Sequence, residues 1–199
     1  MEITKEKLYE LYINKKNSSN KIAKVFGCKE GKINYWLKKF DIKKRTISEA
    51  IYGWHNPDGD PFVLSKNHYS GNSFLFGLGL GLYWGEGNKK NKYAVRLGNS
   101  DPEIIYYFIK FLEEIYGIDK KKLRFAVQIF SDMDVKKNLI YWSKKIKMPI
   151  SQFYKTTITP SRGIGTYREK SKYGVLTVHF SNKKLRDIIC NEIEKLKER

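Results

Sequence analysis

An apolar stretch whose glycines recur at every fourth position constrains the fold of this chain most. In SFLFGLGLGLYWGEG these glycines are Gly77, Gly81 and Gly85, and Glu86 and Gly87 follow them. On an α-helix they share one face, which carries no side chains and lets another backbone approach closely. Such spacing is best known from membrane helices, but the near-apolar run 74–85 is too short to span a bilayer and ends at an acid. We therefore predict a helix over 73–86 that packs on another protein helix, and no membrane partner.

Charge narrows the class of partner. The 199 residues include 39 Lys and Arg against 21 Asp and Glu, a net charge of +18. Such an excess is typical of proteins that bind polyanions, so we expect nucleic acid rather than a small-molecule substrate. Two cysteines and three histidines never occur at ligand spacing, which excludes a disulfide framework and a Cys/His zinc cluster. The N-terminal segment has no apolar signal core, and we expect a cytoplasmic protein, nucleoid-associated if the source is prokaryotic.

Composition divides the chain into three regions, predicted as a small all-α domain at 1–46, a linker at 47–72 and a larger domain at 73–199. Turn residues fill the linker, where no helical period is evident. In the third region helices and strands alternate, which predicts an α+β domain. We expect helices at 73–86, 101–117, 134–146 and 182–198 and strands at 92–98, 123–130, 152–158 and 173–180.

The first region resembles the small helix-turn-helix units of resolvases and many mobile-element proteins. In SSNKIAKVFGCKEGKINYWLKKF a helix ends at Gly27 and a second begins immediately. The residues expected to hold the pair together are Ile22, Val25, Ile33, Trp36 and Leu37. The residues left for groove or phosphate contacts are Lys29, Glu30, Lys32, Asn34, Tyr35 and Lys38. The alternative is a basic helical hairpin that packs on the main domain and touches no DNA.

Alternation along three of the strands predicts one apolar and one polar sheet face. The residues expected on the apolar face are Tyr93, Val95, Leu97, Leu123, Phe125, Val127, Ile129, Leu176, Val178 and Phe180. Those opposite are Lys92, Arg96, Arg124, Gln128, Tyr173, Thr177 and His179. A face of this kind suits a sheet laid into a major groove, although an ordinary solvated face looks much the same.

A basic loop at 160–172 is the second expected contact with nucleic acid. Its cations are Arg162, Arg168, Lys170 and Lys172, and glycines between them give flexibility. We expect this loop to bind phosphates. The alternative is a mobile, solvated hairpin.

The segment GLGLYWGEG resembles the motif of the LAGLIDADG homing endonucleases. The match places the central glycine, the small seventh residue, the metal-binding acid and the terminal glycine at Gly81, Gly85, Glu86 and Gly87. Two positions depart from the motif, because Gly79 replaces its first leucine and Trp84 its polar or acidic sixth residue. The order of the expected elements over 73–199 is compatible with this family.

The resemblance implies a four-stranded antiparallel sheet and a homodimer that packs through Gly77, Gly81 and Gly85. Two Glu86 side chains, with Gly85 beside them in the metal site, would then bind Mg²⁺ and hydrolyse phosphodiester bonds of double-stranded DNA. A loose match assigns His179 to the family's basic residue near the scissile phosphate, with Lys170 and Lys172 as competitors.

Other functions remain open on the sequence alone. Glu86 could simply meet solvent or a lysine such as Lys89 or Lys90. The rival to an endonuclease is a DNA-binding regulator that has the same fold and does not cleave. Charge and aromatic content also permit an RNA-binding module.

Overall fold

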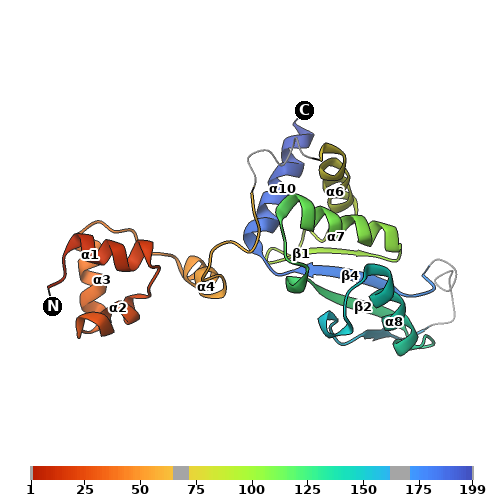
Figure 1. The fold of residues 1–199 in the computed structure, drawn as a ribbon, viewed down its shortest axis with the longest axis horizontal. Coiled ribbons are helices and arrows are strands. Elements are labelled where there is room, and N and C mark those ends of the chain that lie inside the picture. The colour runs from red at the N-terminus through yellow and green to blue at the C-terminus, as the bar shows by residue number, and fades with distance from the viewer. Residues whose placement is uncertain (1, 65–71, 162–170, 199) are drawn as a thin grey trace. The chain divides into compact units, whose positions relative to one another are not determined.

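The computed structural model describes residues 2–64, 72–161 and 171–198. The chain forms two compact units, Met1–Asp60 and Pro61–Arg199 (Figure 1). None of the helices in the described part of the chain is long and apolar enough to cross a bilayer.

Short helices around one small core form the first unit. They are α1 (Lys5–Tyr9), the π-helical turn η1 (Glu10–Asn14), α2 (Ser19–Phe26) and α3 (Glu30–Lys39). Gly27 ends α2 in the left-handed conformation, with φ 62°, as the tight turn between α2 and α3 requires. Buried Ile22, Ile33 and Leu37 join the two helices as predicted, and Trp36 packs partly buried against them. Val25 is 50% exposed, so its predicted place between the helices is wrong: it lies on the outer side of α2.

Arg45 closes this first unit. Its backbone N–H donates to the Tyr12 hydroxyl at 3.0 Å, and its guanidinium donates to the carbonyl oxygens of Lys16 and Asn17. The guanidinium carbon also lies 4.5 Å from the centre of the Tyr12 ring. A single arginine therefore fastens the chain that leaves α3 to η1 and the residues after it.

The predicted linker contains structure at both ends. Thr46 and Glu49 form a capping box at the start of helix α4 (Ile47–His55), so the expectation that no helix forms here is wrong. Its apolar residues Ile47, Ile51 and Trp54 are exposed. At the other end, Phe62 is buried in the core of the second unit, which therefore begins before residue 73.

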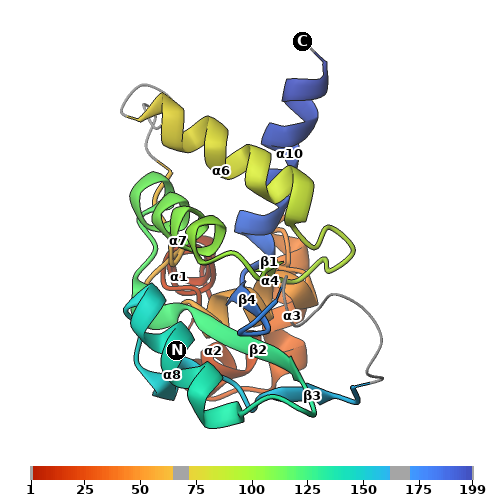
Figure 2. The same cartoon turned by 90° about the vertical axis from the view of Figure 1, so that its right-hand side faces the viewer.

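The second unit contains a four-stranded sheet in the order β1-β4-β2-β3. Its strands are β1 (Val95–Asn99), β2 (Arg124–Phe130), β3 (Thr157–Thr159) and β4 (Val175–Phe180). β4 pairs antiparallel with β1 and β2, but β3 runs parallel to β2 (Figure 2). The sheet is mixed, and the prediction of a wholly antiparallel sheet is wrong. The reason is that α8 (Val135–Ile146) connects β2 to β3 as a crossover, which returns the chain in the same direction.

Helices cover the apolar face of this sheet. Besides α8 they are α6 (Ser73–Glu86), α7 (Pro102–Tyr116) and α10 (Lys183–Lys197), with the short turns η2 (Lys120–Lys122) and η3 (Ile150–Gln152). Figure 1 shows α6, α7 and α10 together on one side of β1 and β4. The side chains of Asp101, Asp134 and Asn182 cap the N-termini of α7, α8 and α10. The α+β class and the four predicted helices are confirmed.

Candidate functional site

The two faces of α6 differ sharply. Leu75, Leu80 and Tyr83 are buried in the core of the second unit. Gly79 faces the same way, and a Cβ there would lie 2.1 Å from two ring carbons of Phe111. At the predicted face of Gly77, Gly81 and Gly85, by contrast, an added Cβ would meet nothing within 4 Å. The predicted bare face is therefore the open face of this subunit.

Apolar side chains flank the bare glycines. Phe74 is 73% exposed and Trp84 47% exposed, and Leu78 between them is half-buried. A helix that is apolar on every side is normally covered on every side, so this open face is the kind of surface that meets a partner.

Glu86 ends α6 with its carboxylate exposed. Neither lysine considered as a partner pairs with it. The Lys89 ammonium donates to the carbonyl oxygens of Trp84 at 2.5 Å and Tyr83 at 3.4 Å, and among the described residues no ion pair joins Glu86 to Lys90. The last four carbonyl groups of a helix lack partners within it. The Gly85 and Glu86 carbonyls, with the Glu86 carboxylate, are therefore the oxygen atoms that this helix end offers to a cation.

In the described part of one subunit, Glu86 is not a member of a metal-binding cluster of side chains. Within residues 2–64, 72–161 and 171–198 no group of three or more His, Cys, Asp and Glu side chains is placed to hold a metal ion. Oxygen ligands are the type that Mg²⁺ prefers. The donors at this helix end fit such an ion in kind, and a second subunit would have to bring further ligands.

The alternation predicted for the strands is confirmed over β1, β2 and β4. The residues on the covered face are almost fully buried, namely Val95, Leu97, Phe125, Val127, Ile129, Leu176, Val178 and Phe180. Tyr93 is the exception: it is 75% exposed, and the prediction that it points into the core is wrong. The Asn91 side chain accepts the backbone N–H groups of Tyr93 and Ala94, so Lys92 and Tyr93 lie in a turn before β1.

A basic row crosses the polar face. Arg96 on β1 and Arg124 on β2 are both register partners of His179 on β4. The Arg124 guanidinium donates to the carbonyl oxygens of Lys121 and Leu123. Further along β2, the Gln128 amide donates to the Thr159 hydroxyl at 3.1 Å. The structure thus brings Arg96, Arg124, Gln128 and His179 onto one face.

His179 is the titratable group at the centre of this row. Burial lowers its pKa to about 4, and the positive charge of Arg96 contributes. Its ring and that of Tyr154 are nearly perpendicular, with 5.6 Å between the ring centres. The imidazole is therefore neutral at physiological pH.

Backbone pairing connects this row to Glu86. Gly87 pairs with Leu97 of β1, and the Asn88 N–H donates to the Arg96 carbonyl at 2.8 Å. Since Arg96 is in turn the partner of His179, β1 alone lies between the end of α6 and His179. A Cβ at position 87 would lie 2.3 Å from the Tyr83 carbonyl oxygen, so glycine is required where the chain turns from α6 to the sheet.

The predicted contacts of the first unit lie on and beside α3. Lys29 precedes the helix, Lys32, Tyr35 and Lys38 are exposed, and Asn34 is half-buried. Lys39 belongs to the same surface and was not predicted: its ammonium lies 4.6 Å from the centre of the Trp36 ring. Its spacing from Tyr35 and Trp36 would have placed it there.

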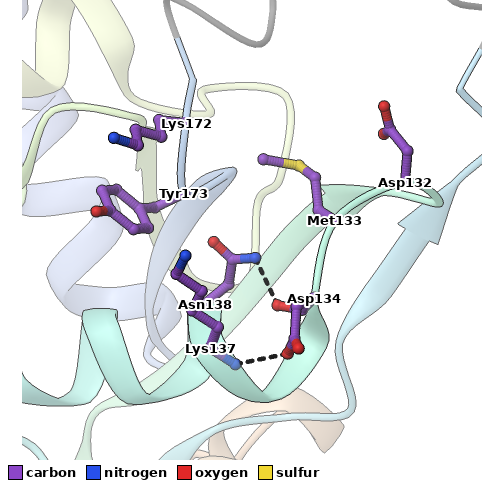
Figure 3. Close-up of a pocket in the computed structure, with 7 residues that line it drawn as sticks. All are labelled: Asp132, Met133, Asp134, Lys137, Asn138, Lys172 and Tyr173. Carbon is purple, nitrogen blue, oxygen red and sulfur yellow. Dashed lines mark hydrogen bonds between the residues drawn. The ribbon is translucent and has the colours of Figure 1, made fainter.

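Most of the predicted basic loop lies outside the described residues. Arg162, Arg168 and Lys170 belong to this part. Lys172 is exposed and lines a pocket of about 410 Å³ beside the start of α8, which the sequence did not indicate (Figure 3). Its other lining residues are Asp132, Met133, Asp134, Lys137, Asn138 and Tyr173. The Asn138 amide donates to the Asp134 carbonyl at 2.6 Å, and Asp134 itself caps α8. Two acidic side chains, Asp132 and Asp134, and two basic ones, Lys137 and Lys172, thus line this pocket.

The candidate site thus combines a bare apolar helix face, an exposed carboxylate at its end and a basic sheet face one strand away. No protein-family model, no curated protein and no solved structure matches the chain significantly.

Proposed function

We propose that the protein is a site-specific, Mg²⁺-dependent endonuclease of double-stranded DNA that acts as a homodimer. The observation that carries this proposal is the open, side-chain-free face of α6, which ends at the exposed Glu86. This arrangement agrees with the resemblance of GLGLYWGEG to the LAGLIDADG motif. The proposal includes a LAGLIDADG-like arrangement of the α+β domain, in which the parallel pairing of β3 is a departure from the expected antiparallel sheet.

Symmetry explains why a second copy suits this face. In a two-fold dimer the same patch meets itself, so the bare stripes of Gly77, Gly81 and Gly85 oppose each other. Two helices without side chains along their contact can approach backbone to backbone. When the two-fold axis runs along the paired helices, both copies of Glu86 lie near that axis, at the same end of the pair.

The chemistry requires little else from each subunit. A bound Mg²⁺ would activate water and stabilise the leaving oxygen. Glu86, with the Gly85 and Glu86 carbonyls, would hold that ion. The neutral His179 imidazole accepts a hydrogen bond from water and so orients it, while its low pKa makes it a weak base. Arg96 adds positive charge that favours the phosphate.

Sequence recognition falls to the polar sheet face and to α3. Arg96, Arg124 and Gln128 offer donors of the type that read base edges, and the lysines of α3 and Lys172 suit phosphates. A symmetric dimer would favour a roughly palindromic site. With a DNA substrate, we expect the protein in the cytoplasm, associated with the nucleoid if the source is prokaryotic.

The decisive experiment offers the protein a randomised plasmid library with Mg²⁺ and sequences the ends produced. We expect double-strand breaks at a recurring site, lost in Glu86→Gln while mobility shifts persist. Glu114→Gln serves as the matched control, since the ion pair of this exposed carboxylate on α7 among the described residues is with Lys110 in the same helix. Breaks that persist in Glu86→Gln would refute the catalytic role of Glu86, and breaks that never form with the wild type would refute an endonuclease.

One observation favours a second candidate, a DNA-binding regulator that does not cleave. Trp84, exposed beside Glu86, replaces the polar or acidic residue of the motif. In that case the same library would give mobility shifts at a recurring site without Glu86-dependent ends. Competition between duplex DNA and structured RNA at matched salt separates both from an RNA-binding module.

A further inference from the structure

The end of α6 carries bonds from two basic side chains far apart in the sequence. The Lys89 ammonium donates to the Tyr83 and Trp84 carbonyl oxygens in the last turn of the helix, and the Tyr83 carbonyl also accepts the Gly87 N–H. The Arg186 guanidinium of α10 donates to the Lys89 carbonyl at 2.6 Å. We call this pair, Lys89 and Arg186, the α6 clamp.

Arg186 is itself held in place. Its side chain is only 16% exposed, and its guanidinium pairs with Asp187 at 3.1 Å. Asp187 in turn pairs with Lys183 one turn earlier in α10. The clamp therefore ties the last turn of α6 to a helix of the core, on both sides of Glu86 in the chain.

The positive charge of the clamp and its bonds to α6 should have opposite effects on a cation at Glu86. Two positive side chains near a bound Mg²⁺ would repel that ion, so their charge alone would weaken cation binding at Glu86. Their geometric effect is the opposite, because bonds to the carbonyls and to the following turn restrict how the end of α6 moves. Residues that orient a metal ligand in this way strengthen metal binding.

We propose that Lys89 and Arg186 are positioning residues that fix the end of α6 so that Glu86 meets the cation in one orientation. This inference rests on the proposed metal site of Glu86. The two effects of the clamp have opposite signs, so a single substitution distinguishes them. Loss of positioning weakens cation binding, whereas loss of repulsion strengthens it.

Terbium luminescence measures cation binding without cleavage. Tb³⁺ binds oxygen ligands, and Trp84, exposed two residues before Glu86, can transfer excitation energy to it. Titration of the full-length protein with Tb³⁺ gives an affinity for the wild type, and Glu86→Gln shows how much of the signal belongs to the site. Thermal unfolding of each variant checks that its fold is intact.

We expect Lys89→Met to bind Tb³⁺ about tenfold more weakly, and Lys89→Arg to restore most of the affinity because it keeps a donor. Arg186→Met should weaken binding in the same direction. Lys90→Met is the matched control: it removes the same charge one residue away, where no bond to α6 occurs among the described residues, and should leave binding equal or tighter.

Two results would overturn the inference, and they differ. Unchanged or tighter binding in Lys89→Met, with a Glu86-dependent signal in the wild type, refutes positioning and leaves the metal site intact. A wild-type signal that does not depend on Glu86 refutes the metal site itself, and the inference with it.

Discussion

Two glycines of α6, two residues apart, should respond to alanine in opposite ways. At Gly79 the added methyl group would lie 2.1 Å from two ring carbons of Phe111 and 2.7 Å from its Cβ. Phe111 is fully buried and has no room to turn away, so overpacking should cost about 1–3 kcal/mol. Alanine gains about 1 kcal/mol over glycine in a helix, which offsets part of that cost. We expect Gly79→Ala to lower the unfolding free energy by up to about 2 kcal/mol.

At Gly81 the methyl group meets nothing within 4 Å of the subunit. Only the helix propensity remains, so Gly81→Ala should raise the unfolding free energy of the monomer by about 0.8–1 kcal/mol. In the dimer the same methyl group stands between two backbones, and association should weaken. One substitution thus stabilises the monomer and destabilises the dimer.

Two measurements at several protein concentrations separate the two effects. Urea unfolding gives the stability, and sedimentation of the same samples gives the fraction of dimer. Dilute samples report the monomer, whose urea midpoint should rise in Gly81→Ala and fall in Gly79→Ala. Concentrated samples should show less dimer for Gly81→Ala than for the wild type. If Gly81→Ala lowers the monomer midpoint as Gly79→Ala does, the glycine face is not open and the reasoning fails.

Three further predictions follow from individual contacts. Because the pKa of His179 is about 4 when folded, against an ordinary value of 6.5, the unfolded chain binds more protons between these values; stability should fall as pH drops through this window, by less than about 1.4 kcal/mol per pH unit after solvent screening. Denaturant titrations at stepped pH give the unfolding free energy at each pH. Its fall with decreasing pH should be less steep for His179→Gln than for the wild type, and an equal slope would contradict the depressed pKa. Arg45→Ala removes the guanidinium bonds to the Lys16 and Asn17 carbonyl oxygens and the contact with the Tyr12 ring, and it should lower the thermal midpoint of the first unit, followed by tryptophan fluorescence, without moving that of the second. Phe62→Ala should do the reverse, lowering the stability of the second unit by about 3–5 kcal/mol, and no effect would show that Phe62 lies outside that core.

Local signals made the helices of the second unit predictable. Asp101 caps α7 and Gly117 ends it with φ 59°, and both features can be read from adjacent residues. The parallel pairing of β3 was not predictable in this way, because its partner strand β2 precedes it by a whole helix. The α4 helix was missed because Pro57 and Gly59 indicated turns, while the capping box of Thr46 and Glu49 stands before them.

In the candidate site, too, features set by neighbouring residues were predictable and contacts between distant segments were not. Glycine spacing predicted the shared face of α6, since periodicity within one helix is local. That Gly79 must be glycine depends on Phe111, which packs against it from another helix. Arg186 reaches the end of α6 from 97 residues away, and nothing near either residue in the sequence indicates the contact.

Disulfide cross-linking at position 84 tests the central claim most directly, because two cysteines can be joined only when their Cα atoms come within about 7 Å. Trp84 is exposed on α6 beside the bare glycines, and cysteine there adds no bulk between the two backbones. With Cys28 and Cys190 replaced by serine, Trp84→Cys on mild oxidation should give a covalent dimer that still binds the target DNA. Tyr93→Cys, also exposed but outside α6, should remain monomeric. A Trp84→Cys protein that stays monomeric, or that cross-links no faster than Tyr93→Cys, would contradict a dimer formed through this helix.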